Sequence, residues 1–187
     1  MATRYYIDSV DNNWSTAGNW WTDAGHTIAL GGLPASTDSV VLSAVLNEPA
    51  YVVTVVNLTT SYDFAATLTC SLATFNSTAI NTGDITGTAI FNGTSDNQGS
   101  IVGNVTFNGS ATHSFSSIAG DVTFNGTSQL TGGYILGACI FNGSSTASTG
   151  TITGGITFND SAELVDVNVL GDCTFNDTSK SLNSTGT

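Results

Sequence analysis

The sequence predicts an all-β fold, a single-stranded parallel β-helix (β-solenoid) of 16-17-residue coils with a Trp-rich N-terminal cap. A Phe-Asn pair recurs seven times, apolar residues alternate with polar or small ones before each pair, and the repeat is too short for a strand-helix-strand crossover. The spacings are 16, 16, 17, 17, 17 and 17 residues, and the pairs begin at Phe75, Phe91, Phe107, Phe124, Phe141, Phe158 and Phe175. Self-similarity at a fixed short period is typical of solenoids, in which each unit forms one coil.

The alternation identifies the inner face of each coil. In the segment 118–124, Ile118, Gly120, Val122 and Phe124 occupy every second position. Period two indicates a strand with one buried face. Equivalent residues of successive coils stack about 4.8 Å apart, so we expect the seven phenylalanines to form a ladder in the core. We expect the recurrent glycine to mark a bend where a side chain does not fit.

The asparagine after each phenylalanine has the opposite parity and should face outward or end the strand at a corner. Every copy reads Asn-x-Ser/Thr, at Asn76, Asn92, Asn108, Asn125, Asn142, Asn159 and Asn176. Two interpretations remain open: a column of N-glycosylation acceptors, or an asparagine ladder whose amides hydrogen-bond from coil to coil at the turn. The seven copies do not discriminate between them, because repeat duplication copies the motif.

Cysteine and histidine give no sign of a metal site or a disulfide. Cys139 and Cys173 share an inward offset two coils apart, hence about 9.6 Å, whereas a disulfide needs Cα atoms within about 7 Å. We therefore expect both to be small buried residues, and Cys70 to be unpaired. His26 and His113 lie far apart in the sequence, and we expect each to be a surface residue. No cofactor, metal-binding or catalytic residues are predicted.

The chain divides at about residue 60. Residues 1–60 are predicted to form an N-terminal cap and entry strands, and residues 61–187 the solenoid repeats. The end coil of a solenoid needs a cover for its apolar ladder and strand edge. Trp14, Trp20 and Trp21 all lie in this segment, and we expect them to form the cap. Two entry strands are expected at about 38–43 and 51–59.

Charge excludes several kinds of partner. The chain of 187 residues has two basic residues against 14 acidic ones, for a net charge of −12. Phosphate neutralisation requires several cations on one face, so we expect no nucleic-acid partner.

No apolar run approaches 18 residues, which predicts no membrane insertion. The first thirty residues show no basic region followed by an apolar one, so we expect no signal peptide in this sequence.

A local motif adds a resemblance. Trp14 to Trp20 reads W-x-x-x-G-N-W, and Pro34 to Val40 reads P-x-x-x-D-x-V after a glycine-rich stretch. Over these roughly thirty residues and the repeats, the chain resembles β-solenoid surface and fibre proteins, both phage fibre-like proteins and bacterial adhesin or autotransporter-passenger proteins. The resemblance implies a structural or adhesive role and brings no catalytic residues. The lack of a signal peptide favours the phage-like group.

Three functions follow as expectations. The first is a non-catalytic, self-associating component of a virion fibre or extracellular surface filament, through head-to-tail contacts or as a homotrimer. The second is a carbohydrate-binding adhesin or receptor-binding module, with Tyr5, Tyr6, Tyr134, Trp20 or Trp21 stacking on surface glycans. The third is a polysaccharide-degrading β-helix enzyme. It is disfavoured because such chemistry uses converging carboxylates, often with basic residues, and the only two basic residues lie near opposite ends of the chain.

Overall fold

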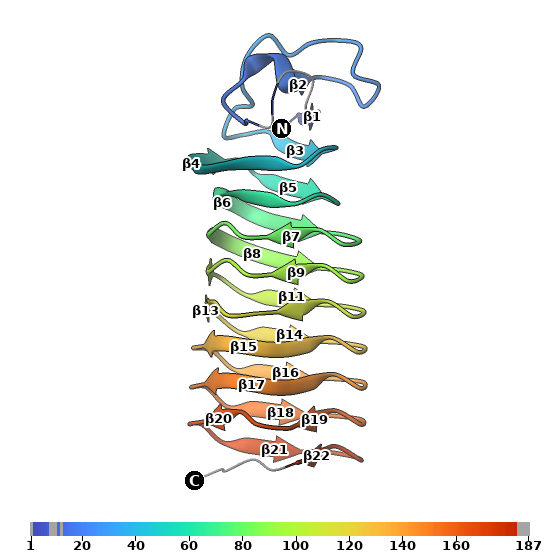
Figure 1. The fold of residues 1–187 in the computed structure, drawn as a ribbon, viewed down its shortest axis with the longest axis vertical. Coiled ribbons are helices and arrows are strands. Elements are labelled where there is room, and N and C mark those ends of the chain that lie inside the picture. Colours follow the sequence, from blue (N-terminus) through green and yellow to red (C-terminus); the bar gives the residue numbers. More distant parts are fainter. Residues whose placement is uncertain (1, 8–10, 12, 183–187) are drawn as a thin grey trace.

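The computed structural model describes residues 2–7, 11 and 13–182. It is all-β, a β-solenoid of about eight turns with coils of about 17 residues, so the predicted fold class is confirmed. The coils stack along a single axis, with the N-terminal segment at one end and the last described strands at the other (Figure 1). Within the described ranges, the short 3-10 helix η1 (Ala17–Asn19) is the only helix.

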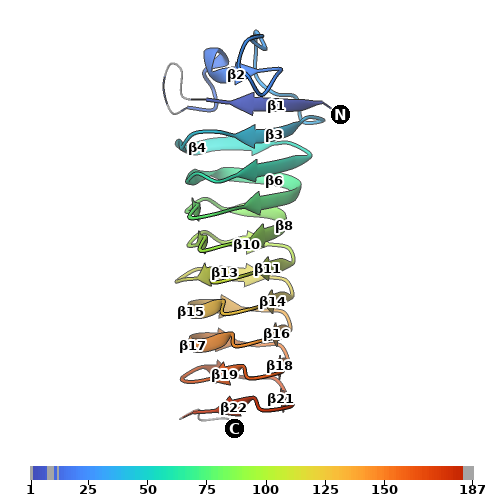
Figure 2. The same ribbon diagram turned by 90° about the vertical axis from the view of Figure 1, so that its right-hand side faces the viewer.

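The N-terminal segment covers the first coil. Strand β1 (Thr3–Tyr6) pairs antiparallel with β2 (Trp20–Trp21) and parallel with β3 (Ser39–Leu42) (Figure 2). Trp20 is fully buried between Trp14 and Tyr6, with ring centroids 4.4 and 5.0 Å away. Its indole Nε1 donates a hydrogen bond of 2.9 Å to the Trp14 carbonyl. Trp21 is only half-buried, so two of the three tryptophans form the interior of this cover.

Parallel stacking already begins in the first sixty residues. Strand β3 pairs with β5 (Asn57–Thr60), and β4 (Leu46–Thr54) pairs with β6 (Phe64–Phe75). The strand predicted at 38–43 contains β3. The range predicted at 51–59 is divided between β4 and β5, because the chain turns a corner there: Val55 is buried, and the Val56 N–H donates to the Asp38 carbonyl at 2.9 Å.

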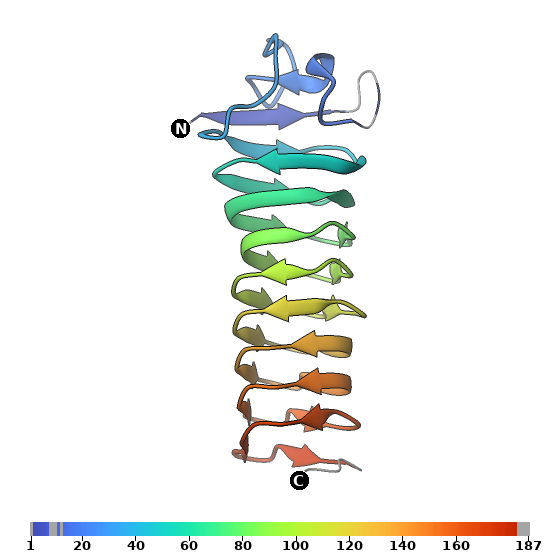
Figure 3. The same cartoon turned by 90° about the vertical axis from the view of Figure 1, so that its left-hand side faces the viewer.

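From β6 onward, each coil has three faces, which are seen from two sides in Figures 2 and 3. The phenylalanine face consists of the end of β6, β8 (Ile85–Phe91), β11 (Val105–Phe107), β14 (Val122–Phe124), β16 (Cys139–Phe141), β18 (Ile156–Phe158) and β21 (Cys173–Phe175). After the Asn turn, the second face contains β7 (Ile80–Asn81), β9 (Asp96–Asn97), β12 (Thr112–His113), β19 (Glu163–Leu164), β22 (Lys180–Ser181) and the starts of β15 (Gln129–Ile135) and β17 (Thr146–Ile152). The third face contains β10 (Ile101–Val102), β13 (Ser117–Ala119), β20 (Asn168–Val169), the start of β8 and the ends of β15 and β17.

The phenylalanines form one column through the core. Strand register pairs each ring with the equivalent ring of the next coil. The six successive pairs have centroids 4.5–5.1 Å apart and interplanar angles of 5–18°. Six of the seven side chains are fully buried, whereas Phe175 in the last described coil is 39% exposed. Each buried ring from Phe91 to Phe158 therefore stacks between two like rings, and Phe75 begins the column with one.

The recurrent glycine lies at the corner between the third face and the phenylalanine face. A Cβ built on Gly120 would collide with the carbonyl oxygen of Gly103, and one built on Gly137 with that of Gly120. The backbones of successive coils thus approach too closely at this corner for any side chain. This is the physical reason for the glycine that the repeat pattern contains.

Candidate interaction surface

The repeated asparagines form a continuous hydrogen-bonded column. From Asn92 onward, each Nδ2 donates to the Oδ1 of the asparagine one coil earlier, as Asn125 does to Asn108 at 2.9 Å. All six links between Asn76 and Asn176 measure 2.8–3.0 Å. The six asparagines before Asn176 are half-buried at the corner. Because the amide nitrogens already serve as ladder donors, the geometry supplies a structural role for the motif, while occupancy by glycans stays a prediction.

The residue after each asparagine has a left-handed backbone. The column comprises Ser77, Gly93, Gly109, Gly126, Gly143, Asp160 and Asp177, with φ between 56° and 75°. Glycine adopts this conformation without steric cost, and aspartate tolerates it better than most residues. The Asp160 carboxylate also accepts a hydrogen bond of 2.9 Å from the Gly143 N–H. The Ser/Thr that follows also bonds to the turn of the preceding coil, as where the Thr127 hydroxyl donates to the Gly109 carbonyl at 3.2 Å. The turn residues of the motif therefore hold successive coils together.

His113 is wholly buried, so its prediction as a surface residue is wrong. It follows Asn81 and Asn97 at the same offset from the phenylalanine, and all three lie inside the solenoid. The Asn81 amide donates to Asn97 Oδ1 at 2.7 Å, and Asn97 Nδ2 lies 3.1 Å from His113 Nδ1. The same offset holds Leu130, Ala147 and Leu164 in later coils. Aligning the copies by offset would have shown that His113 faces inward.

Burial lowers the pKa of His113 to about 4, although hydrogen bonds and the nearby Asp96 charge act in the opposite direction. The imidazole is therefore neutral at pH 7, with its Nε2 buried and without a hydrogen-bond partner. His26 lies in the N-terminal cover, half-buried against the ring of Trp21. The structure does not bring the two histidines together. Among the described residues, no group of three or more His, Cys, Asp or Glu side chains is arranged to hold a metal ion.

The three cysteines are free thiols. Register places Ile156 between Cys139 and Cys173, as the offsets predict. Cys139 is buried, and burial raises the pKa of its thiol. Cys173 was also expected to be buried, but it is exposed, because it belongs to the last described coil, where no further coil packs over it. Burial raises the pKa of Cys70 to about 11, which leaves that thiol protonated at neutral pH.

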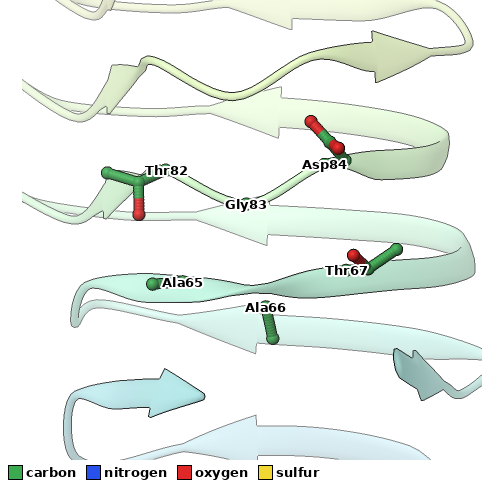
Figure 4. Close-up of a pocket in the computed structure, with 6 residues that line it drawn as sticks. All are labelled: Ala65, Ala66, Thr67, Thr82, Gly83 and Asp84. Atoms are coloured by element: carbon green, nitrogen blue, oxygen red, sulfur yellow. The ribbon is translucent and has the colours of Figure 1, made fainter. Parts of the chain in front are cut away.

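Two adjoining hollows lie on the early coils. One, of about 150 Å³, is lined by Ala65, Ala66, Thr67, Thr82, Gly83 and Asp84 (Figure 4). The other, of about 290 Å³, shares Ala65 and Thr82 and contains Asp63. Each hollow has one carboxylate, and both carboxylates bind backbone: Asp84 accepts from the Ser100 N–H at 3.2 Å and Asp63 from the Ile80 N–H at 2.9 Å. Their geometry explains how neighbouring coils are joined and does not present a pair of carboxylates to a substrate.

The third face carries a group of exposed apolar side chains, which we call the aromatic patch: Val102, Phe115, Tyr134 and Leu136. Phe115 is 83% exposed and Tyr134 59% exposed, and the other two are also more than half exposed. The strands place them on adjoining coils, since Ile101 pairs with Ile118 and Ile118 with Ile135. Phe115 and Tyr134 lie at the bend between the second and third faces, and Val102 and Leu136 lie at the other end of the third face, next to Gly103 and Gly137.

Of the aromatic residues predicted to stack on glycans, the structure leaves only Tyr134 largely exposed. Tyr6 and Trp20 are fully buried in the N-terminal cover, and Tyr5 and Trp21 are half-buried opposite each other in the β1–β2 pair. Sequence reasoning missed Phe115. Its signal is the extra residue of the 17-residue coils, which lies in the bend after His113. Ile101 is four positions after Asn97, whereas Ile118 is five positions after His113.

Comparisons of the chain with protein-family models, with curated proteins and with solved structures find no match. Within the described residues, no helix is long and apolar enough to cross a membrane. The functional argument therefore depends on the geometry of the coils and their surfaces.

Proposed function

We propose that the chain is a non-catalytic structural protein, a rod-like component of a virion fibre or extracellular surface filament. The observation that carries this proposal is the pair of uninterrupted columns through seven coils, one of stacked phenylalanine rings and one of hydrogen-bonded asparagines. A solenoid is stabilised by contacts between adjacent repeats. Ladders that repeat in every coil therefore favour an elongated body of uniform cross-section, as a fibre requires.

Head-to-tail association with further copies is part of this proposal. In the last described coil, all three residues of β21 are exposed, and β21 pairs with β18 on one side. An open strand edge readily pairs with another strand. In the proposed filament, the Trp-rich N-terminal segment of a second copy docks on that edge and covers the Phe175 ring. A homotrimer of parallel rods is the alternative arrangement.

Sedimentation velocity combined with negative-stain microscopy tests the proposal. We expect the chain to form rods that lengthen with concentration. Phe175→Lys places a charge on the ladder of the last described coil and should abolish the lengthening. Thr174→Lys is the matched control, because its side chain has the opposite parity and leaves the ladder intact. A chain that stays monomeric over a wide concentration range, or a Phe175→Lys variant that still elongates, would contradict head-to-tail association.

A further inference from the structure

The backbone holds one aromatic side chain in solvent in an unfavourable conformation. Phe115 has φ +68°, in the left-handed region, where a bulky residue is a genuine outlier. A tight turn maintains it, because the Ser116 N–H donates to the Ser114 carbonyl at 2.9 Å. The 83% exposed side chain gains little from packing in return. Strained conformations of this kind gather at binding sites, where the surrounding structure holds them.

A second exposed ring lies on the next coil. Ser117 pairs with Tyr134, and the Tyr134 N–H donates to the Ser116 carbonyl at 2.9 Å. Tyr134 is thus the diagonal neighbour of Phe115, with Cα atoms about 8 Å apart from the strand and coil spacings. Gly132 and Gly133 stand opposite the Phe115 turn and carry no side chain. A Cβ on Gly132 would lie 3.7 Å from Phe115 Cδ1, so the Phe115 ring lies close to this bare backbone, and no side chain of these two positions separates it from Tyr134.

The charge around the patch restricts its partner. The whole segment 97–153, which spans the patch, contains one charged residue, Asp121, although the chain has a net charge of −12. Asp121 lies at the corner between the third face and the phenylalanine face, away from Phe115 but beside Leu136, and its carboxylate accepts from the Ala138 N–H at 2.9 Å. Asp96, just before the segment, is bound by the hydroxyls of Thr112 and Ser114 at 2.6 and 3.2 Å. An anionic partner would be repelled by the chain, and a cationic one would find a single carboxylate, that of Asp121, at the edge of the patch.

The size of the patch argues against a second copy of the chain as its occupant. The patch covers three coils of about 4.8 Å each by about five residues of about 3.3 Å, an area of about 240 Å². A stable protein interface buries about 800 Å² on each partner. Tyr134 has a hydroxyl residue as its register neighbour on each side, Ser117 on one coil and Thr151 on the other. Aromatic rings beside orienting hydroxyls suit a ligand with apolar C–H faces and polar edges.

We propose that the aromatic patch binds a neutral carbohydrate chain, whose sugar rings stack on Phe115 and Tyr134 and whose hydroxyls bond to the surrounding Ser and Thr side chains. Successive rings on adjacent coils would contact successive sugars, so the saccharide would lie along the solenoid. Because the surface is open rather than enclosed, binding depends on several sugars and should be weak for a monosaccharide. This inference is independent of the filament proposal.

Affinity electrophoresis and calorimetry with defined polysaccharides test whether the aromatic patch binds carbohydrate. Galactomannan and mixed-linkage β-glucan, with their hexasaccharides, serve as neutral probes, and polygalacturonate serves as the anionic comparison. We expect at least one neutral probe to bind and polygalacturonate not to bind. Phe115→Gly removes the ring and suits the positive φ. It should weaken binding at least tenfold while the melting temperature stays equal or rises. Tyr134→Ala should also weaken binding at least tenfold.

The matched control is Tyr62→Ala, because Tyr62 is 45% exposed and lies outside the segment 97–153. This variant should bind as the unmodified chain does. The proposal is overturned if no neutral probe binds, if polygalacturonate binds more tightly, or if Phe115→Gly and Tyr134→Ala leave binding unchanged. It is also overturned if Phe115→Gly abolishes association between copies instead, which would make the patch a contact between chains. A filament that forms without binding any neutral probe would refute this inference alone.

Discussion

The 16-residue coils and the 17-residue coils form the bend between the second and third faces in different ways. In the shorter coils, Asn81 and Asn97 lie inside the solenoid, and their amides donate to the carbonyls of Gly83 and Gly99 at 2.9 and 2.8 Å. In the longer coils after His113, the equivalent position is apolar: Leu130, Ala147 and Leu164, all buried. Buried backbone groups require a partner. The tight bend therefore uses a buried amide, and one additional residue makes that amide unnecessary.

His113 lies at the junction between the two kinds of coil. On one side, its Nδ1 lies 3.1 Å from Asn97 Nδ2, the last amide of the buried asparagine column. On the side of the longer coil, its Nε2 has no hydrogen-bond partner. The extra residue first appears in the bend that follows it, which contains the left-handed Phe115, and the next two longer coils use Gly133 and Gly150 with positive φ in the same bend. The first coil with one additional residue is thus the place where the buried polar column ends and where the strained backbone and exposed ring of Phe115 occur.

The largest expected effect is common to both kinds of coil. Phe91→Ala in a shorter coil and Phe124→Ala in a longer one should each lower the free energy of unfolding by about 3–5 kcal/mol, as truncation of a buried phenylalanine does. Chemical denaturation of both variants measures it. Equal losses would show that the packing of the phenylalanine column does not depend on coil length. A much smaller loss in either variant would show that the column is interrupted at that coil.

Acid should weaken the junction between the two kinds of coil. The folded pKa of His113 is about 4, below its ordinary value of 6.5. As the pH falls from 6.5 to 4, the unfolded chain takes up a proton that the folded chain does not, so stability falls by about 3 kcal/mol and then levels off. Denaturation at several pH values, compared with His113→Leu, isolates this contribution. His26→Gln is the control and should keep the loss; a His113→Leu variant with the same pH dependence would contradict the assignment.

Exchanging the buried residues tests why the two bends differ. Asn97→Leu leaves the Gly99 carbonyl without its donor, and Leu130→Asn buries an amide in a bend that does not need one. Each should cost about 2–3 kcal/mol, the penalty for an unsatisfied buried polar group. Thermal and chemical unfolding would measure both. If Asn97→Leu were neutral or stabilising, the amide would not be supporting the tight bend.

The smallest effect is expected at the outer corner, where the two kinds of coil are alike. Asn92→Ala and Asn125→Ala each remove one member of the asparagine column and should cost about 1 kcal/mol. Differential scanning calorimetry resolves a change of this size. A loss greater than that of Phe124→Ala would mean that the column at the corner, and not the core ladder, is the main contact between coils.

Much of the fold could be predicted because each coil repeats the same chemistry. The strict alternation before Phe124 indicated an inward face, and the constant Phe-Asn spacing indicated the coil. The inward direction of His113 follows from its offset in the repeat, which it shares with Asn97 and Leu130. The exposure of Phe115 does not, because it depends on how one irregular coil fits between its neighbours. Similarly, the exposure of Cys173 depends on the absence of a packed coil beyond it in the described structure, and its offset in the repeat cannot show this.

The sequence by itself determined that this protein is a β-solenoid, which residues point inward in the regular coils, and where the turns lie. Periodicity carries that information, since strand parity and repeat length follow from local chemistry. Only the tertiary structure decided that the motif asparagines bond to one another, that a polar column is buried beside Phe107, and that Phe115 and Tyr134 share an uncharged face. Those outcomes depend on contacts between residues 16 to 18 positions apart, whose backbone positions are fixed only when the coils stack.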